Sequence, residues 1–133
     1  MESWLWAEHN KRRFLESNLL KEHGFKHGFF TKDWQDIHPR ELSLNFGESI
    51  NTHFLKQIHS GEIINASLTN KGTPREADGL ISDLPKQSLW VYTADCIPVL
   101  IADKVSKRVA ACHSGWKGIA KRILPTAIKK MES

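Results

Sequence analysis

Two apolar runs around a polar connection place the tightest constraint on what this chain can fold into. Residues 98–102 form the first run, residues 108–113 form the second, and the polar residues 103–107 lie between them. Apolar runs this short are more typical of strands than of helices, and a short polar turn between two of them is typical of a β-hairpin. We therefore expect an antiparallel pair of strands here, with His113 at the end of the second strand.

Alternation within the second run divides its side chains between two faces. Successive side chains of a strand point to opposite faces, so Val109, Ala111 and His113 share one face while Ala110 and Cys112 share the other. We therefore expect Cys112 to belong to the core and not to a site that includes His113.

The first half of the chain gives weaker signals. Residues 4–6 alternate like a strand, whereas residues 10–22 place apolar side chains at near-helical spacing among charges and predict an amphipathic helix. Residues 52–66 alternate in two pieces that meet near Ser60. This pattern predicts two extended segments with His59 at the bend between them.

A helical pattern follows the second run and begins near Trp116 or Lys117. Pro125 is expected to kink or split this helix, because proline lacks a donor and crowds the preceding turn. The apolar residues expected on the buried face are Ile119, Ile123, Ala127 and Ile128. Together with a strand predicted over residues 88–93, these elements favour an α+β fold in which helices pack on a mixed sheet.

Length and composition bound the class of protein. At 133 residues the chain has room for one domain, residues 1–133, and its 40% hydrophobic and 26% charged residues are ordinary for a globular protein. The longest apolar run, residues 97–102, is far shorter than the roughly 20 residues that cross a bilayer, and the N-terminus shows no apolar signal segment. We therefore expect a cytoplasmic protein that does not enter a membrane.

The net charge of +4 is concentrated near the C-terminus, where residues 104–133 hold eight Lys and Arg against the single acid Glu132. A basic run without interleaved aromatic residues is typical of the solvated face of a helix. Nucleic-acid binding is therefore not expected, while an anionic small substrate stays open. Two cysteines are too few for a disulfide framework and are expected to be thiols in a reducing compartment.

Three residues at predicted strand ends and bends carry side chains suited to chemistry. His59 lies at a bend, Cys96 lies between two predicted strands with Asp95 beside it, and His113 lies where a strand gives way to a helix. Two nitrogens and one sulfur are donors that zinc favours, and three protein ligands leave a fourth position open, as in catalytic zinc sites. The helix start after His113 also offers free backbone N–H groups to a phosphate.

The residue types leave other interpretations open. Cys96 can be a nucleophile that His113 activates, with Asp95 or Asp78 orienting the imidazole, in a cysteine hydrolase. Cys96 can also be a small buried hydrophobic residue near incidental histidines. Copper oxidase chemistry is disfavoured, because multicopper sites use many histidines, often in His-x-His pairs, and none of the seven histidines here forms such a pair.

Four motifs, in order along the chain, resemble the signatures of one protein family. They are Lys56-Gln57-Ile58-His59 with Gly61, Ala77-Asp78-Gly79-Leu80-Ile81, Thr93-Ala94-Asp95-Cys96-Ile97-Pro98-Val99-Leu100 and Ala111-Cys112-His113-Ser114-Gly115-Trp116-Lys117-Gly118. The chain is similar to the YfiH/LACC1 family, first described as multicopper polyphenol oxidases or laccase-domain proteins and now as zinc-dependent purine nucleoside phosphorylases with adenosine deaminase activity. Ser60 departs from the family pattern, which has glycine directly after the histidine.

The resemblance implies a layered α/β/β/α fold and a zinc site at His59, Cys96 and His113, with copper as the historical alternative. It implies cytoplasmic enzymes that cleave adenosine, inosine, guanosine or methylthioadenosine with phosphate and that also deaminate adenosine. It further implies that the C-terminal part of the family domain is missing here. That absence would expose apolar surface, which favours oligomerisation, or would leave an inactive metal-binding remnant.

Substrate contacts and proton transfer are expected to fall on residues next to the ligands. Trp116 and Lys117, at the helix start, are the candidates to bind substrate and phosphate. Asp95 or Asp78 is the candidate to move protons during deamination, because zinc nucleobase deaminases use a carboxylate that is not a ligand. Either aspartate can instead brace a turn or orient a histidine.

Overall fold

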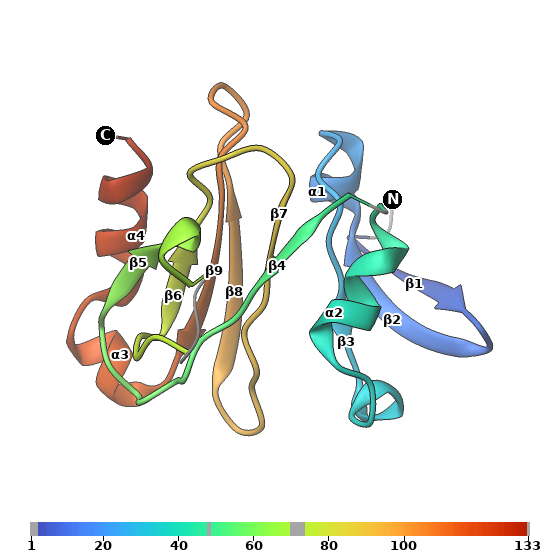
Figure 1. Ribbon diagram of the computed structural model, residues 1–133, viewed down its shortest axis with the longest axis horizontal. Coiled ribbons are helices and arrows are strands. Elements are labelled where there is room, and N and C mark those ends of the chain that lie inside the picture. Colours follow the sequence, from blue (N-terminus) through green and yellow to red (C-terminus); the bar gives the residue numbers. More distant parts are fainter. Residues whose placement is uncertain (1–2, 48, 70–73, 133) are drawn as a thin grey trace. The chain divides into compact units, whose positions relative to one another are not determined.

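The computed structural model describes residues 3–47, 49–69 and 74–132 (Figure 1). Its contacts cluster into two compact units, Met1–Glu48 and Ser49–Ser133. The single domain predicted over residues 1–133 stays a prediction. Within the described residues, no helix is both long enough and apolar enough to cross a membrane.

A three-stranded antiparallel sheet forms the centre of the first unit. Strands β1 (Trp4–His9) and β2 (Arg12–Ser17) pair as a hairpin, and β3 (Phe29–Phe30) pairs with β2. The two turn residues of the hairpin, Asn10 and Lys11, both have positive φ angles, 52° and 65°, as a tight hairpin turn requires.

The helix predicted over residues 10–22 is wrong for most of its length. Only α1 (Asn18–Glu22) is helical, and Ser17 caps its start, since the Ser17 side chain accepts a hydrogen bond from the Leu20 N–H. The preceding residues are extended because cross-strand packing outweighs their weak helical spacing. Phe14, for example, stacks on Phe30 with ring centroids 4.7 Å apart.

Short helical turns complete the first unit. They are η1 (Lys32–Trp34), α2 (Pro39–Leu42) and η2 (Ser43–Asn45). Trp34 is buried, and its indole N–H donates to the Arg13 carbonyl at 2.8 Å. The indole thereby ties η1 to β2 while its ring fills the small aromatic core beside Phe14 and Phe30.

The second unit is built on a four-stranded mixed sheet in the order β5-β6-β9-β8 (Figure 1). Strands β8 (Ile97–Ala102) and β9 (Val109–Ser114) pair antiparallel, which confirms the predicted hairpin. Strand β6 (Gly79–Ile81) is antiparallel to β9 and parallel to β5 (Ile63–Asn65). The α+β class with a mixed sheet is confirmed.

A separate parallel pair joins β4 (Asn51–His53) to β7 (Gln87–Leu89), and the turn η3 (Ala66–Thr69) follows β5. The two extended segments predicted within residues 52–66 are present as β4 and β5, and His59 lies in a bend between them. The strand predicted over residues 88–93 begins as expected but ends at Leu89.

The C-terminal helical pattern is split, as predicted, into α3 (Trp116–Ala120) and α4 (Ile123–Met131). The break lies at Arg122, whose φ is 59°. Pro125 is the third residue of α4, where a missing N–H costs no helical hydrogen bond.

Helix α4 contacts β9, β6 and β5 and closes one face of the sheet (Figure 1). The core between them consists of Ile63, Ile81, Ala110, Cys112, Ile123, Ala127 and Met131. The predicted burial of Cys112 is therefore confirmed. The predicted helix face is wrong in part: Ile119 and Ile128 are about half exposed, because the break changes the register of Ile119 and Met131 takes the place expected for Ile128.

Candidate metal centre

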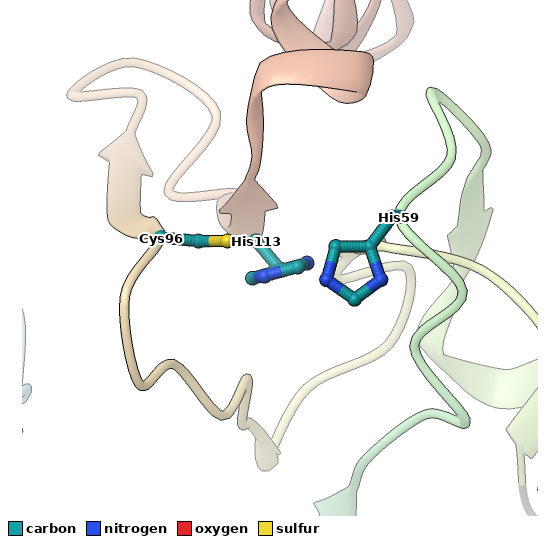
Figure 2. A group of neighbouring side chains, drawn as sticks. All are labelled: His59, Cys96 and His113. Atoms are coloured by element: carbon teal, nitrogen blue, oxygen red, sulfur yellow. The ribbon is translucent and has the colours of Figure 1, made fainter.

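Three separate segments of the second unit bring His59, Cys96 and His113 together (Figure 2). His59 comes from the bend before β5, Cys96 immediately precedes β8, and His113 is the next-to-last residue of β9. One donor atom from each side chain lies within 4.8 Å of the other two. The three residues that the sequence singled out therefore converge, although 37 and 17 positions separate them in the chain.

The three side chains differ in exposure. His113 is 4% exposed, Cys96 is half-buried and His59 is exposed. The two imidazole rings are nearly perpendicular, at 80°, with centroids 5.1 Å apart. The donors thus line a site that is anchored in the sheet on one side and open to solvent on the other.

Asp78 connects two of the three donors. It is fully buried immediately before β6, and its carboxylate accepts hydrogen bonds from the backbone N–H groups of Ile58, His59 and Ser60 at 3.1, 3.0 and 2.8 Å. It also accepts from the Ser60 hydroxyl at 2.7 Å and from His113 Nδ1 at 2.6 Å. One carboxylate therefore fixes the bend that carries His59 and the ring of His113.

This hydrogen bonding keeps Asp78 ionised and indicates which atom of the pair carries the shared proton. Burial alone would raise the pKa of Asp78, but hydrogen bonds from the Ser60 backbone, His113 and the Ser60 hydroxyl outweigh it and hold that pKa below its usual 3.8. An ionised carboxylate only accepts hydrogen bonds, so the proton between the two residues lies on His113 Nδ1. In a neutral imidazole with its proton on Nδ1, Nε2 carries the free lone pair that a metal ligand requires.

Close backbone contacts hold the His59 bend against the C-terminal helices. A Cβ added at Gly61 would lie 2.7 Å from Lys121 Cβ, and one added at Gly118 would lie 3.0 Å from the Ser60 carbonyl oxygen. His59 itself has a φ of 60°, which is uncommon for a residue with a side chain. The surrounding contacts therefore fix a bend that the local sequence does not favour.

Gly115 forms a wall of the site. A Cβ at this position would lie 3.3 Å from Cys96 Sγ, 3.5 Å from His59 Cδ2 and 3.9 Å from His113 Cε1. The backbone between β9 and α3 therefore approaches all three donors, and a side chain here would press on the cysteine sulfur.

The two cysteines lie in different environments, and neither is in a disulfide. Cys112 is fully buried under α4, and burial raises the pKa of its thiol to about 12. Cys96 is half-buried beside the histidines. Only Cys96 is placed to act as a ligand or a nucleophile.

The other predicted site residues lie next to this cluster in the chain. Asp95 is exposed and immediately precedes Cys96. Trp116 is 76% exposed directly after Gly115, and the Lys117 Nζ lies 5.8 Å from the centre of its ring. Helix α3 has only five residues, so Lys117 offers a stronger positive charge than the helix start.

Sequence reasoning missed two contributors to the site. Gly115 enters the sequence prediction only as a member of a motif, and Ser60 only as the residue near which two extended segments meet and as a departure from a motif. The signal for Gly115 was available, since an unsubstituted residue directly after His113 permits close approach of the backbone. No local signal identified the Ser60 hydroxyl as a partner of Asp78, which lies 18 positions away.

Comparison with known proteins places the chain in a family. Residues 38–133 match the family model described as multi-copper polyphenol oxidoreductase laccase. The chain belongs to this family. Its sequence is 38% identical to a purine nucleoside phosphorylase of Synechocystis sp. over 133 residues, which cover 96% of this chain and 50% of the relative.

Further relatives agree with this assignment. A purine nucleoside phosphorylase of Clostridium acetobutylicum is 35% identical over 118 residues, covering 89% of this chain and 44% of the relative. The crystal structure of a Neisseria meningitidis protein described under the DUF152 family superposes with a TM-score of 0.65 at 27% identity, covering 99% of this chain and 58% of that one. The chain thus spans about half the length of the curated relatives it matches.

Proposed function

We propose that this member of the family is a zinc-dependent purine nucleoside phosphorylase that also deaminates adenosine. The convergence of the His59, Cys96 and His113 donors is the observation that carries the proposal. The names of the relatives from Synechocystis and Clostridium support the phosphorylase activity. Zinc and the deaminase activity rest on the donor set and on the family resemblance.

The donor set fits zinc. Zinc–nitrogen and zinc–sulfur bonds of about 2.0–2.3 Å place tetrahedral ligand atoms roughly 3.3–3.8 Å apart. The three donors lie within 4.8 Å of one another, so small side-chain rotations suffice to complete the site. Two imidazoles and one thiolate would supply three protein ligands, and three protein ligands are typical of a catalytic zinc site, whereas a structural site has four.

A zinc ion held there would act as a Lewis acid and lower the pKa of a water molecule. The residues of the chain have supporting roles. Asp78 accepts a hydrogen bond from His113 Nδ1 and so leaves His113 Nε2 as the ring atom that would bind the metal. Asp95, exposed beside Cys96, is the carboxylate we assign to proton transfer in deamination, because Asp78 is fully buried and already accepts five hydrogen bonds.

Trp116 and Lys117 are the residues we assign to substrate. An exposed indole offers a flat surface on which a purine base can stack, and an ammonium group attracts phosphate. The phosphorolysis joins phosphate to the ribose C1 and releases the free base, and the deamination exchanges the adenosine amino group for oxygen from water with release of ammonia. Both reactions place a flat purine and a charged or polar group beside the open side of the site.

An assay of adenosine with phosphate tests the proposal. The zinc-loaded chain should yield adenine and ribose 1-phosphate by phosphorolysis of adenosine. It should also yield inosine by deamination of adenosine, and hypoxanthine by phosphorolysis of that inosine. Omission of phosphate should abolish adenine and leave inosine. A folded, zinc-loaded chain that forms neither product would refute the proposal and leave a metal-binding remnant of the family.

A cysteine hydrolase is the second candidate, because the Asp78–His113 hydrogen bond resembles the orienting pair of a Cys-His-Asp triad. His59 favours the zinc site over the hydrolase. A Cys-His-Asp triad needs one imidazole, whereas here a ligand atom of His59 also lies within 4.8 Å of those of Cys96 and His113. Alkylation of Cys96 that zinc does not slow would favour the hydrolase. A copper-dependent polyphenol oxidase is favoured only by the name of the family model, and turnover of phenols that needs added copper would support it.

The proposed compartment and partners follow from the same site. Two free thiols suit a reducing compartment such as the cytoplasm. The proposed partners are purine nucleosides and phosphate, and the donor cluster itself calls for neither nucleic acid nor membrane. A second copy of the chain is an open partner that sedimentation of the purified protein would reveal.

A further inference from the structure

The segments that carry His59, Cys96 and His113 are called here the three arms of the metal centre. Each pair of arms is held together in a different way. The backbone pairing of β8 with β9 joins the Cys96 arm to the His113 arm, since Ile97 pairs with Ser114 and Pro98 with His113. The Asp78 carboxylate joins the His113 arm to the His59 arm. The remaining connection, between the His59 arm and the Cys96 arm, depends on a residue without an assigned role.

That residue is Gln57, two positions before His59. Its side-chain amide donates from Nε2 to the Tyr92 carbonyl at 2.7 Å, and its Oε1 accepts from the Tyr92 N–H at 2.7 Å. Both backbone hydrogen-bonding groups of Tyr92 are therefore satisfied by one side chain, in the way that a neighbouring strand would satisfy them. Tyr92 itself is 73% exposed, so its ring does not anchor the segment.

The backbone at Gln57 is firmly held on both sides. Lys56 donates its N–H to the Arg75 carbonyl at 2.9 Å and accepts from the Ala77 N–H at 3.2 Å, and Ile58 donates to Asp78. The segment that carries Cys96 is held less closely. It runs from Trp90, whose N–H donates to His53, to Ile97 at the start of β8, and Gln57 holds it between these two points.

We propose that Gln57 is the positioning residue that holds the segment around Cys96 beside His59, and so sets the affinity of the site for its metal. The effect on metal affinity rests on the proposed metal site, whereas the positioning of the Cys96 segment does not. Loss of the Gln57 amide should free residues 91–96 to move away from the histidines. It should leave the sheet, the core and the Asp78 network intact, because none of them includes the Gln57 side chain.

Gln87 offers a matched control. Its side-chain amide accepts from the Asp83 and Leu84 backbone N–H groups at 2.9 and 3.1 Å and donates to the Asp83 carboxylate at 3.0 Å, all in the same unit. It is not part of the donor cluster. A Gln87→Ala substitution therefore removes a comparable set of hydrogen bonds away from the three donors.

The first measurement needs no metal. Iodoacetamide alkylation of the metal-free chain reports on Cys96 alone, because Cys112 is fully buried. Gln57→Ala should react several-fold faster at Cys96 than the wild type, with Gln87→Ala unchanged. Gln57→Glu keeps an acceptor for the Tyr92 N–H but places a second carboxylate oxygen, which cannot donate, against the Tyr92 carbonyl. Its rate should therefore also exceed that of the wild type, and it serves should the alanine variant fail to fold.

The second measurement is zinc affinity by competition with a chromophoric chelator, with the thermal midpoint of each metal-free variant alongside. Gln57→Ala should bind zinc about tenfold more weakly, a usual cost of losing a residue that supports metal ligands, at a midpoint equal to that of Gln87→Ala. A wild-type alkylation rate in Gln57→Ala would overturn the positioning role. A faster rate in a chain whose wild type takes up no zinc would uphold that role and refute the metal site.

Discussion

The Asp78→Asn substitution should destabilise the chain more than any other single-atom change at the site. The buried carboxylate accepts five hydrogen bonds, whereas an asparagine oxygen has two lone pairs and the new amide group adds two donors. The N–H groups of Ile58 and His59 can recover water at the exposed bend. The Ser60 N–H, the Ser60 hydroxyl and His113 Nδ1 are buried and compete for one oxygen.

Each buried donor without a partner costs about 1–3 kcal/mol, and breaking a buried pair typically costs about 3–5 kcal/mol. We therefore expect the free energy of unfolding to fall by about 4 kcal/mol, which at a urea m-value of about 1.5–2 kcal/mol/M lowers the midpoint by roughly 2 M. Asp83→Asn is the control, since Asp83 is exposed and also accepts from a serine N–H and hydroxyl. An Asp78→Asn midpoint no lower than that of Asp83→Asn would refute the reasoning.

The same variant tests the sign of the pKa shift. Because the folded-state pKa of Asp78 lies below the usual 3.8, its stabilising contribution is complete above that pH and is lost as the pH falls through the lower folded value. The wild type should therefore lose stability below about pH 4 more steeply than Asp78→Asn. If the free energy of unfolding fell equally with pH in both proteins below about pH 4, the ionised carboxylate of Asp78 would contribute nothing to stability.

Three further substitutions and treatments test other parts of the account. Burial lowers the pKa of His53 below 6.5 despite the nearby Asp83. The wild type should therefore lose stability as the pH falls from about 7.5 to 5.5, and His53→Gln should lose less. Urea midpoints measured at the two pH values test this. Iodoacetamide at about pH 8 should modify one thiol of the native chain, at Cys96, and both in urea, and mass spectrometry of peptides that finds native Cys112 labelled would contradict its burial. Gly115→Ala should weaken zinc binding in calorimetric titration without unfolding the chain, because its Cβ would lie 3.3 Å from Cys96 Sγ. An unchanged zinc affinity would show that the backbone at Gly115 shifts to make room for the added Cβ.

The parts of the fold that follow local rules were predictable from the sequence. The β8–β9 hairpin follows from two short apolar runs around a polar turn, and the helix break follows from Pro125. The N-terminal helix was mispredicted because the aromatic packing of Phe14 on Phe30 depends on residues 16 positions apart. A pattern within a short stretch of sequence does not reveal such long-range pairing, and this pairing decides whether the segment forms a strand or a helix.

The candidate site divides in the same way. Its three donors were identifiable as chemically suited residues at predicted strand ends and bends, and the structure brings them together. The role of Asp78 stayed open between a proton shuttle and a brace, because its partners at Ser60 and His113 lie 18 and 35 positions away. Gln57 belongs to a motif, but nothing in the sequence pointed to its contact with Tyr92, which lies 35 positions away and is visible only once the segments are placed.

The metal content of the purified chain beside its Cys96→Ala variant tests the central claim most directly. Elemental mass spectrometry should find about one zinc per wild-type chain and a clear loss in the variant, since two imidazoles alone hold zinc weakly. Circular dichroism of both samples establishes that the variant is folded. Metal absent from the folded wild type, or equal in both samples, would contradict a centre formed by His59, Cys96 and His113.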